Sequence, residues 1–208
     1  MKKANPTVLS SPTSEISVGT NIGLLGGSFN PAHEGHLEIS LLALEKLSLD
    51  CIWWMVSPQN PLKPKKGMAS ISERLSTARS TADDPRISVT DIETELGTLY
   101  TADTLLALLD RFSETRFVWL MGADNLLGMH HWQKWSKIFY TVPVAVFARP
   151  NYSLPAEKAE ATKRFAGYRM PILQAHHLAG KQPPAWVFFK QPLNPISATE
   201  IRSYNKND

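Results

Sequence analysis

Short apolar segments alternate with amphipathic ones along most of this chain. Six apolar segments have the length and composition of strands; they are residues 22–25, 51–56, 87–90, 117–121, 142–148 and 186–189. Several of them are apolar without interruption, which is typical of strands buried on both faces of a parallel sheet. These segments are therefore predicted to be the strands of a buried sheet.

The segments between the strands carry apolar residues at helical spacing. Ser70 and Ser72 with Glu73 offer caps for one helix, and Thr101 begins another helical run. The predicted helices are residues 36–47, 72–82, 102–112, 126–129 with 132–138, 156–165 and 198–204.

This alternation of strands and helices predicts an α/β fold with a doubly wound, mostly parallel sheet. Such sheets bind ligands at the carboxyl ends of their strands, at the point where the strand order reverses. The loops after Leu25, Val56, Met121 and Ala148, with the turn before the last helix, are thus expected to converge on one cleft.

The composition is that of an ordinary globular protein, with 208 residues, 43% apolar and 20% charged. We expect one domain over residues 21–208 and a disordered Ser/Thr/Pro-rich tail over residues 1–20. The tail lacks the apolar core of a secretory signal, and no apolar run approaches the roughly 20 residues of a membrane helix. A net charge of +3 without a basic stripe suits an anionic small molecule and argues against nucleic-acid or membrane partners.

Cys51 is the only cysteine, which excludes an intramolecular disulfide. Its apolar neighbours favour a small buried hydrophobe over a catalytic thiol. A reducing, cytoplasmic location is consistent with this cysteine usage. The sequence leaves a homo-oligomer open.

The first chemically distinctive motif covers residues 26–36, Gly-Gly-Ser-Phe-Asn-Pro-Ala-His-Glu-Gly-His, between a predicted strand and a predicted helix. Gly26 and Gly27 allow close approach of the backbone to a phosphate. The helix N-terminus attracts anions, and His33 and His36 add donors to phosphate oxygens. The loop is therefore predicted to bind phosphate. Zinc binding and a purely structural histidine pair are the alternatives, but no suitable third ligand is near apart from two glutamates.

The second motif covers residues 194–202, Asn-Pro-Ile-Ser-Ala-Thr-Glu-Ile-Arg. Ser197, Thr199 and Arg202 gather where a loop enters a predicted helix. Ser197 with Glu200 can simply form a capping box. Two hydroxyls and a guanidinium at a helix start also suit a polyphosphate, and both interpretations can hold together.

Together the two motifs resemble those of the nucleotidyltransferase superfamily with H-x-G-H and I-S-x-T-x-x-R signatures. Four further segments, residues 58–63, 100–105, 122–135 and 148–150, narrow the resemblance to bacterial nicotinate-nucleotide adenylyltransferases. The resemblance covers residues 21–204. It implies a Rossmann-like nucleotidyltransferase fold and adenylyl transfer from ATP to nicotinate mononucleotide, giving deamido-NAD and pyrophosphate.

The resemblance also implies roles for individual residues. Catalytic contacts are implied for His33, His36 and Arg202, and ATP contacts for Gly26, Gly27, Ser28, Phe29, Gly122, Asp124, Ile196, Ser197 and Thr199. Mononucleotide contacts are implied for Asn60, Lys63, Thr101, Trp132 and Arg149. Roles without a substrate contact stay open for two of them: Lys63 as a solvated surface residue, and Asp124 as the N-cap of a helix.

The implied reaction is in-line attack of the mononucleotide phosphate on the α-phosphorus of ATP. This nucleophile is already anionic, so no general base is assigned, and catalysis rests on positioning and charge stabilisation. Mg²⁺ is expected as a cofactor bound mainly through ATP phosphates, with no metal ligands assigned to the protein.

Two positions depart from the superfamily pattern: Asn30 replaces a common aspartate, and Ala198 replaces a common serine. We expect both changes to be tolerated. Three rival functions remain: adenylyl transfer to nicotinamide mononucleotide or pantetheine phosphate, a non-catalytic nucleotide sensor, and a nucleic-acid-binding module.

Overall fold

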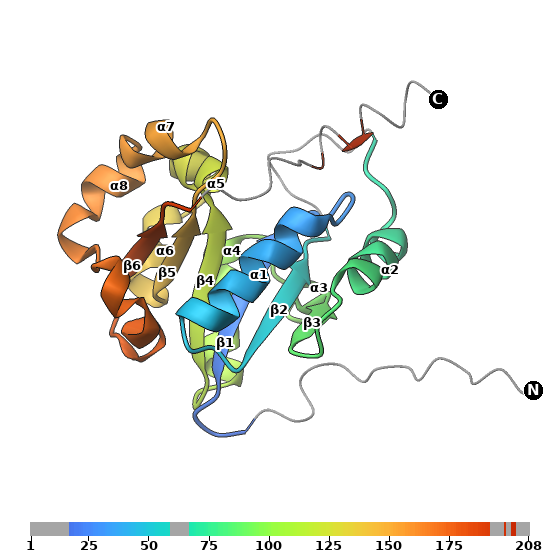
Figure 1. Cartoon of the computed structure of the whole chain (residues 1–208). Helices are drawn as coiled ribbons and strands as arrows, with labels where there is room; N and C mark the ends of the chain where they lie inside the picture. Colours follow the sequence, from blue (N-terminus) through green and yellow to red (C-terminus); the bar gives the residue numbers. More distant parts are fainter. Residues whose placement is uncertain (1–16, 59–66, 192–197, 199–200, 203–208) are drawn as a thin grey trace, which may run out of the picture.

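The computed structural model describes residues 17–58, 67–191, 198 and 201–202 (Figure 1). Within these residues six strands form one sheet in the order β3-β2-β1-β4-β5-β6. The strands are β1 (Asn21–Gly27), β2 (Cys51–Val56), β3 (Ile87–Thr90), β4 (Arg116–Gly122), β5 (Val144–Phe147) and β6 (Trp186–Phe189). All neighbouring strands are parallel. The predicted doubly wound α/β fold is confirmed, with the reversal of strand order between β1 and β4.

The continuous apolar strands are buried on both faces of the sheet, as their composition predicted. The neighbouring side chains Trp53 and Trp54 of β2 point to opposite faces, and each is at most 1% exposed. Two apolar cores result, one on each face of the sheet.

Helices cover both faces (Figure 1). One core contains side chains of α1 (Glu34–Lys46), α2 (Ile71–Thr81) and the 3₁₀ segment η4 (Ile172–Gly180). The other contains side chains of α3 (Ile92–Glu95), α4 (Thr101–Arg111), α5 (Ala123–Gly128), η2 (Met129–His131), α6 (Trp135–Thr141), α7 (Ser153–Glu157) and α8 (Glu160–Arg164). A further 3₁₀ turn, η3 (Ala166–Tyr168), follows α8.

One predicted helix, residues 156–165, is wrong as a single element because it is broken into α7 and α8. Ala159 adopts an extended backbone, with φ −61° and ψ 156°, between the two short helices. The carbonyl of Ala156, which would accept the Glu160 N–H in a continuous helix, accepts the hydroxyl of Thr162 at 2.7 Å. A side chain thus competes with the helical backbone.

The elements α3 and η4 have no counterpart among the predicted helices, and several others differ from the prediction at their ends. The predicted strand 142–148 is shortened to β5, because Val142 ends α6 as its C-cap. The predicted helix 198–204 is described only at Ala198, Ile201 and Arg202, which are helical.

The predicted disordered tail is described only from residue 17. Residues 17–20 form a turn whose Gly19 N–H donates to the Glu114 carbonyl at 3.0 Å. The division into a tail over residues 1–20 and one domain over residues 21–208 stays a prediction. No helix among the described residues is both long and apolar enough to cross a bilayer.

Candidate active site

The carboxyl ends of four parallel strands lie along one edge of the sheet. The register pairs Gly27 with Val56, and Gly122 with Phe147. The loops that leave β1, β2, β4 and β5 therefore start from the same edge, as the strand pattern predicted. Several predicted site residues belong to these loops. Those that the structure describes therefore lie at this edge.

The histidine pair stands at the start of α1. His33 is the N-cap residue with an extended backbone, and its N–H donates to Nδ1 of His36 at 3.2 Å. The two rings lie 3.9 Å apart between centroids. Because Nδ1 of His36 accepts a hydrogen bond, neutral His36 carries its proton on Nε2. The local backbone thus selects the tautomer that offers an Nε2–H donor.

A stack of aromatic rings supports His36 from the β2 side. The ring of Phe29 lies 4.7 Å from that of His36 and is stacked on Trp54 at 5.2 Å with a 20° interplanar angle. The Trp54 indole N–H donates to Ser40 Oγ at 2.8 Å, and Ser40 donates to the His36 carbonyl at 2.9 Å. Both Trp54 and Ser40 are fully buried. The position of His36 is therefore fixed through α1 and β2.

Sequence reasoning missed Trp54 and Ser40. Ser40 lies one helical turn after His36, which places it below the histidine backbone, and that spacing was the available signal. Nothing in the apolar run of β2 distinguishes Trp54 from Trp53 before the fold is known.

Arg202 of the second motif contacts the loop that contains the first motif. Its guanidinium donates to the carbonyl of Asn30, a residue 172 positions earlier in the chain. The loop after β1 and the segment that follows β6 therefore meet in space. Three predicted site residues of the second motif, Ile196, Ser197 and Thr199, lie outside the described residues, as do Asn60 and Lys63.

Asn30 also ties its loop to the segment before α2. Its side-chain amide donates to the Gly67 carbonyl at 3.1 Å and accepts the Ala69 N–H at 3.2 Å. Asparagine can do both, whereas an ionised aspartate can only accept. The departure from the superfamily pattern thus has a local reason in this chain.

Replacing Asn30 by aspartate is expected to destabilise the fold by about 1–3 kcal/mol, because a carboxylate oxygen would face the Gly67 carbonyl without a donor between them. Urea unfolding of the Asn30→Asp variant at neutral pH measures this loss. An unfolding midpoint equal to that of the unmodified protein would contradict the donor role of the amide.

The loops after β4 and β5 are joined by an ion pair. Arg149 Nη1 lies 2.8 Å from Asp124 Oδ2, and both side chains are partly exposed. Asp124 sits in the first turn of α5, and a Cβ on the neighbouring Gly122 would come within 2.4 Å of Asp124 Oδ1. A larger residue at position 122 would therefore force the Asp124 carboxylate to move. The ion pair thus joins Asp124, a predicted ATP contact, to Arg149, a predicted mononucleotide contact, which neither motif indicated.

The two glycines at the end of β1 have different surroundings. A Cβ on Gly26 would lie 2.4 Å from the ring of Trp119 in β4, so this glycine is required by packing within the sheet. A Cβ on Gly27 would make ordinary contact with Phe29 at 3.4 Å. The contacts of Gly26, Gly27, Ser28 and Phe29 with ATP stay predictions.

Thr101 and Trp132 lie on the α4 side of the sheet. Thr101 is the first residue of α4, and Trp132 follows η2, partly buried against the core. An ion pair between Lys134 Nζ and Asp103 Oδ1, 2.8 Å long, links the two segments. The structure thus brings two predicted mononucleotide contacts, Thr101 and Trp132, to neighbouring segments.

Glu93 is a buried acid near this edge that sequence reasoning missed. It is 6% exposed, and the Thr104 hydroxyl of α4 lies 3.3 Å from its Oε1. Burial raises the pKa of Glu93 above its ordinary value of 4.5, and contacts with the hydroxyls of Ser57 and Thr104 oppose this rise. The carboxyl therefore contacts both the end of β2 and the start of α4.

A carboxyl whose pKa is raised by folding stabilises the folded state below its unfolded pKa, and this contribution is lost as the pH rises through the folded value. Replacing Glu93 by glutamine removes that dependence. The free energy of unfolding of Glu93→Gln, relative to the unmodified protein, is expected to increase between pH 4.5 and pH 8. Urea unfolding across this range measures it; parallel pH profiles would contradict the assignment.

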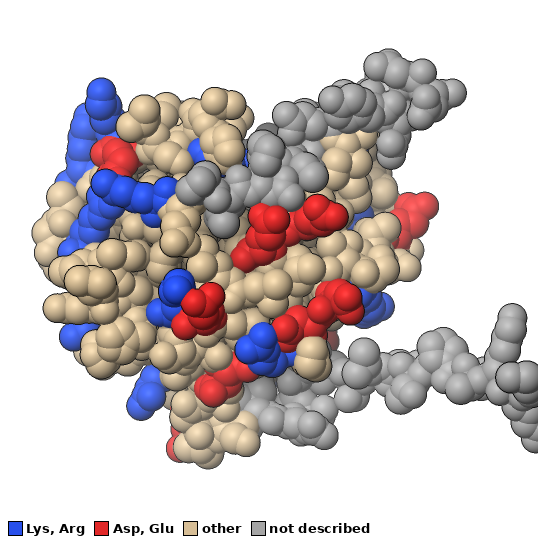
Figure 2. All heavy atoms as spheres, in the orientation of Figure 1, with Lys and Arg blue, Asp and Glu red and all other residues tan. Residues whose placement is uncertain are grey.

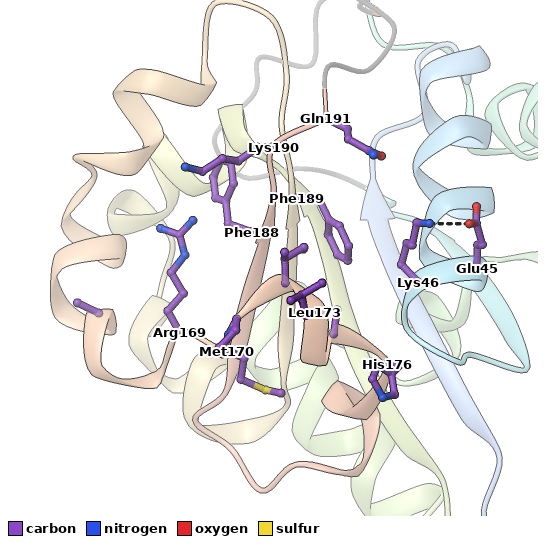
Figure 3. A pocket seen from close by; sticks show the side chains of 14 residues that line it. Glu45, Lys46, Arg169, Met170, Leu173, His176, Phe188, Phe189, Lys190 and Gln191 are labelled. Atoms are coloured by element: carbon purple, nitrogen blue, oxygen red, sulfur yellow. Dashed lines mark hydrogen bonds and ion pairs between the residues drawn. The ribbon is translucent and has the colours of Figure 1, made fainter.

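A separate groove of about 1140 Å³ lies between η4, β6 and the end of α1 (Figure 3). Arg169, Phe188, Phe189 and Lys46 are among its lining residues. None of the sequence-predicted site residues that the structure describes lines it. The groove is therefore distinct from the strand-end site.

The sheet order and the strand-end site define a Rossmann-like nucleotidyltransferase. The chain belongs to the cytidylyltransferase-like family, whose model matches residues 24–204. Within this family, the "Probable nicotinate-nucleotide adenylyltransferase" of Parvibaculum lavamentivorans is 50% identical over 187 residues, which cover 90% of this chain and 93% of that relative. The protein of the same name from a Bradyrhizobium strain is 49% identical, over 88% of this chain and 95% of the relative. The resemblance inferred from the motifs is confirmed.

Solved structures agree on the fold. Plasmodium falciparum nicotinic acid mononucleotide adenylyltransferase complexed with NaAD superposes with a TM-score of 0.67 at 17% identity, covering 89% of this chain and 83% of that one. The same enzyme complexed with APC gives a TM-score of 0.65. At this identity the likeness concerns the fold alone.

Proposed function

We propose that this protein transfers the adenylyl group of ATP to nicotinate mononucleotide, giving deamido-NAD and pyrophosphate. The observation that carries the proposal is the contact between Arg202 and Asn30, which joins the two nucleotidyltransferase motifs at one edge of the sheet. Relatives that share about half of the residues over nearly the whole chain carry the name of this activity.

The phosphates of ATP lie between the two motifs in this proposal. His36 donates its Nε2–H to the α-phosphate, whose negative charge is redistributed as the bond to pyrophosphate breaks. Arg202, with Ser197 and Thr199, holds the β- and γ-phosphates. Donors placed in advance need no rearrangement during the reaction, which is the usual source of rate enhancement in phosphoryl transfer.

The mononucleotide lies on the α4 and α5 side. Arg149, oriented by Asp124, suits its phosphate. Backbone N–H groups at the start of α4, near Thr101, suit the nicotinate carboxylate, since helix N-termini attract anions. Trp132 supplies a flat wall for the pyridine ring, and Asn60 and Lys63 complete the predicted contacts.

Mg²⁺ is included in the proposal as a cofactor bound through the ATP phosphates. Among residues 17–58, 67–191, 198 and 201–202, no cluster of three His, Cys, Asp or Glu side chains could hold a metal. In this proposal the ion keeps its phosphate and water ligands. When bound, the ion neutralises phosphate charge.

The partners proposed are small molecules in a cytoplasmic setting, without nucleic acid or membrane. On the face in Figure 2, acidic side chains spread around the α1 region and basic ones gather beside α7 and α8, so this face shows no continuous basic stripe. A homo-oligomer is retained as a prediction, and sedimentation velocity tests it.

The proposal is tested by pyrophosphate release with ATP and Mg²⁺ and one of three acceptors: nicotinate mononucleotide, nicotinamide mononucleotide or pantetheine phosphate. The highest kcat/KM is expected for nicotinate mononucleotide, because an uncharged amide loses the ionic contact at the start of α4. Preference for another acceptor would replace the assigned substrate. Nucleotide binding without pyrophosphate release from any acceptor would favour a sensor.

A further inference from the structure

Arg74 of α2 is a buried cation that the proposed reaction leaves without a role. Its side chain is 2% exposed. Nε donates to the Ala69 carbonyl at 3.0 Å, and Nη2 donates to the Pro58 carbonyl at 3.0 Å. Nη1 donates to two carbonyls, those of Ser28 at 2.8 Å and Ser57 at 2.7 Å. In the described part of the chain, no carboxylate forms an ion pair with it.

Three of the four carbonyls that Arg74 binds belong to two neighbouring loops at the carboxyl edge of the sheet, and the fourth, that of Ala69, lies just before α2. Ser28 follows β1 directly, and Ser57 and Pro58 follow β2. These strand ends are already adjacent, because the Ser57 N–H donates to the Gly27 carbonyl at 2.9 Å. Arg74 extends this connection beyond the last residues of the two strands.

The bond to Ser28 fixes the direction of one backbone N–H. In a trans peptide the C=O and the following N–H point in opposite directions. The Ser28 carbonyl faces Arg74, so the N–H of Phe29 points away from α2. Phe29 has a positive φ of 45°, which is uncommon for a bulky residue and costs free energy unless its surroundings enforce it.

Two sets of contacts hold Phe29 in this conformation. On one side its ring is stacked on Trp54 and touches His36. On the other, Arg74 holds the carbonyl of the preceding peptide. The same guanidinium therefore influences both the Phe29 N–H and the ring that supports the histidine.

Arg74 also changes the charge balance of this edge. Three carbonyl oxygens gathered behind a phosphate site would disfavour an anion, because each carries a partial negative charge. Guanidinium stays protonated in proteins, and although burial lowers the pKa of Arg74, its charge faces these oxygens directly. The guanidinium thereby offsets the partial negative charge of these carbonyl oxygens before any nucleotide binds.

We propose that Arg74 is a positioning residue for adenylyl transfer: it clamps the loops after β1 and β2 so that the Phe29 N–H and the His36 ring keep the geometry the transition state requires. This inference rests on the proposed function. Arg74 does not touch the substrate in this account; it acts through the Ser28 and Ser57 peptides.

The experiment compares Arg74→Met, which removes the donors and keeps much of the volume, with two controls. Arg79→Met places the same substitution on an exposed position of the same helix. Leu75→Ala weakens the packing of α2, whose Leu75 is 9% exposed, and leaves the clamp in place. The kcat of Arg74→Met is expected to fall roughly 10²-fold, as small displacements of reacting groups do.

Four comparisons separate positioning from stability. Arg79→Met is expected to keep kcat, and Leu75→Ala is expected to lower the melting temperature while keeping kcat within about threefold. Millimolar methylguanidinium is expected to restore part of the kcat of Arg74→Ala and none of the stability of Leu75→Ala. The kcat of Arg74→Lys, which keeps the charge and loses the planar fork of donors, is expected to lie between those of the unmodified protein and Arg74→Met.

The outcomes distinguish a failure of the proposed function from a failure of the clamp role of Arg74. No pyrophosphate release by the unmodified protein would overturn the proposed function itself. An active unmodified protein with Arg74→Met within about threefold of its kcat would overturn the clamp alone. If Arg74→Met does not fold, the kcat of Arg74→Lys is compared with that of Leu75→Ala at a temperature at which both variants are folded. A kcat loss larger than that of Leu75→Ala supports the clamp. A kcat equal to that of Leu75→Ala overturns it.

Discussion

Replacing His36 by alanine is expected to lower kcat for adenylyl transfer by roughly 10²-fold or more, because one donor to developing phosphate charge contributes about 2.7–4 kcal/mol in comparable sites. The structure makes Nε2 the donor, since Nδ1 accepts the His33 N–H. The KM for ATP is expected to change less than kcat, because the contact strengthens in the transition state. Steady-state pyrophosphate release measures both constants.

Two further substitutions at His36 separate the donor from the structural contact. Glutamine places an amide N–H near the position of Nε2 and is expected to keep part of the activity. Asparagine places an acceptor near the position of Nδ1, so it can keep the bond from the His33 N–H while losing the donor. His177→Ala, at an exposed position of η4, is the matched control and is expected to leave kcat unchanged. Asparagine outperforming glutamine would contradict the donor role.

Replacing Arg202 by alanine is the second large expected effect, with kcat/KM for ATP falling roughly 10²-fold or more. The guanidinium connects the second motif to the Asn30 carbonyl. In the proposed function it also supplies positive charge to the ATP phosphates. Lysine restores the charge without the planar fork, so Arg202→Lys is expected to recover only part of the loss. Pyrophosphate release over a range of ATP concentrations gives these values.

Arg86→Ala is the control for the loss of a cation. Arg86 is exposed and forms an ion pair with Asp84 that is 2.8 Å long, away from the strand-end loops. The Arg86→Ala variant is expected to keep the kcat/KM for ATP of the unmodified protein. Arg202→Ala within a few-fold of the unmodified kcat/KM would remove Arg202 from the phosphate site.

The sheet could be predicted from the sequence because its strands are defined locally. Runs such as the one ending at Val56 are apolar on both faces, and only a strand buried between two helical layers accommodates that pattern. The helix boundaries were less predictable because they depend on distant contacts. The break at Ala159 follows from a hydroxyl of Thr162 binding the Ala156 carbonyl, which competes with the backbone in a way that apolar spacing does not reveal.

The candidate site could be inferred from the sequence where histidine, arginine and glycine patterns suggest phosphate binding, as at His36 and Arg202, whose roles stay predictions. It was not predictable where a side chain acts on backbone carbonyls of another segment. Arg74 lies 46 positions from Ser28, and an arginine in a helix of mixed polarity ordinarily indicates a solvated surface. Only the fold shows that its guanidinium points into the edge of the sheet.

Asn30 illustrates the same limit on a smaller scale. Its replacement of aspartate is visible in the sequence, and the sequence predicts only that the change is tolerated. The reason in the structure is a pair of hydrogen bonds to residues 67 and 69, which only an amide can make at once. A departure from a family pattern thus follows from a contact between separate loops.

A crystal structure of the full chain with a non-hydrolysable ATP analogue and Mg²⁺ tests the central claim most directly. We predict phosphate oxygens within hydrogen-bond distance of both His36 Nε2 and the Arg202 guanidinium, on one bound triphosphate. A triphosphate held elsewhere, such as in the groove beside η4 and β6, or one that contacts only one of the two side chains, would contradict it.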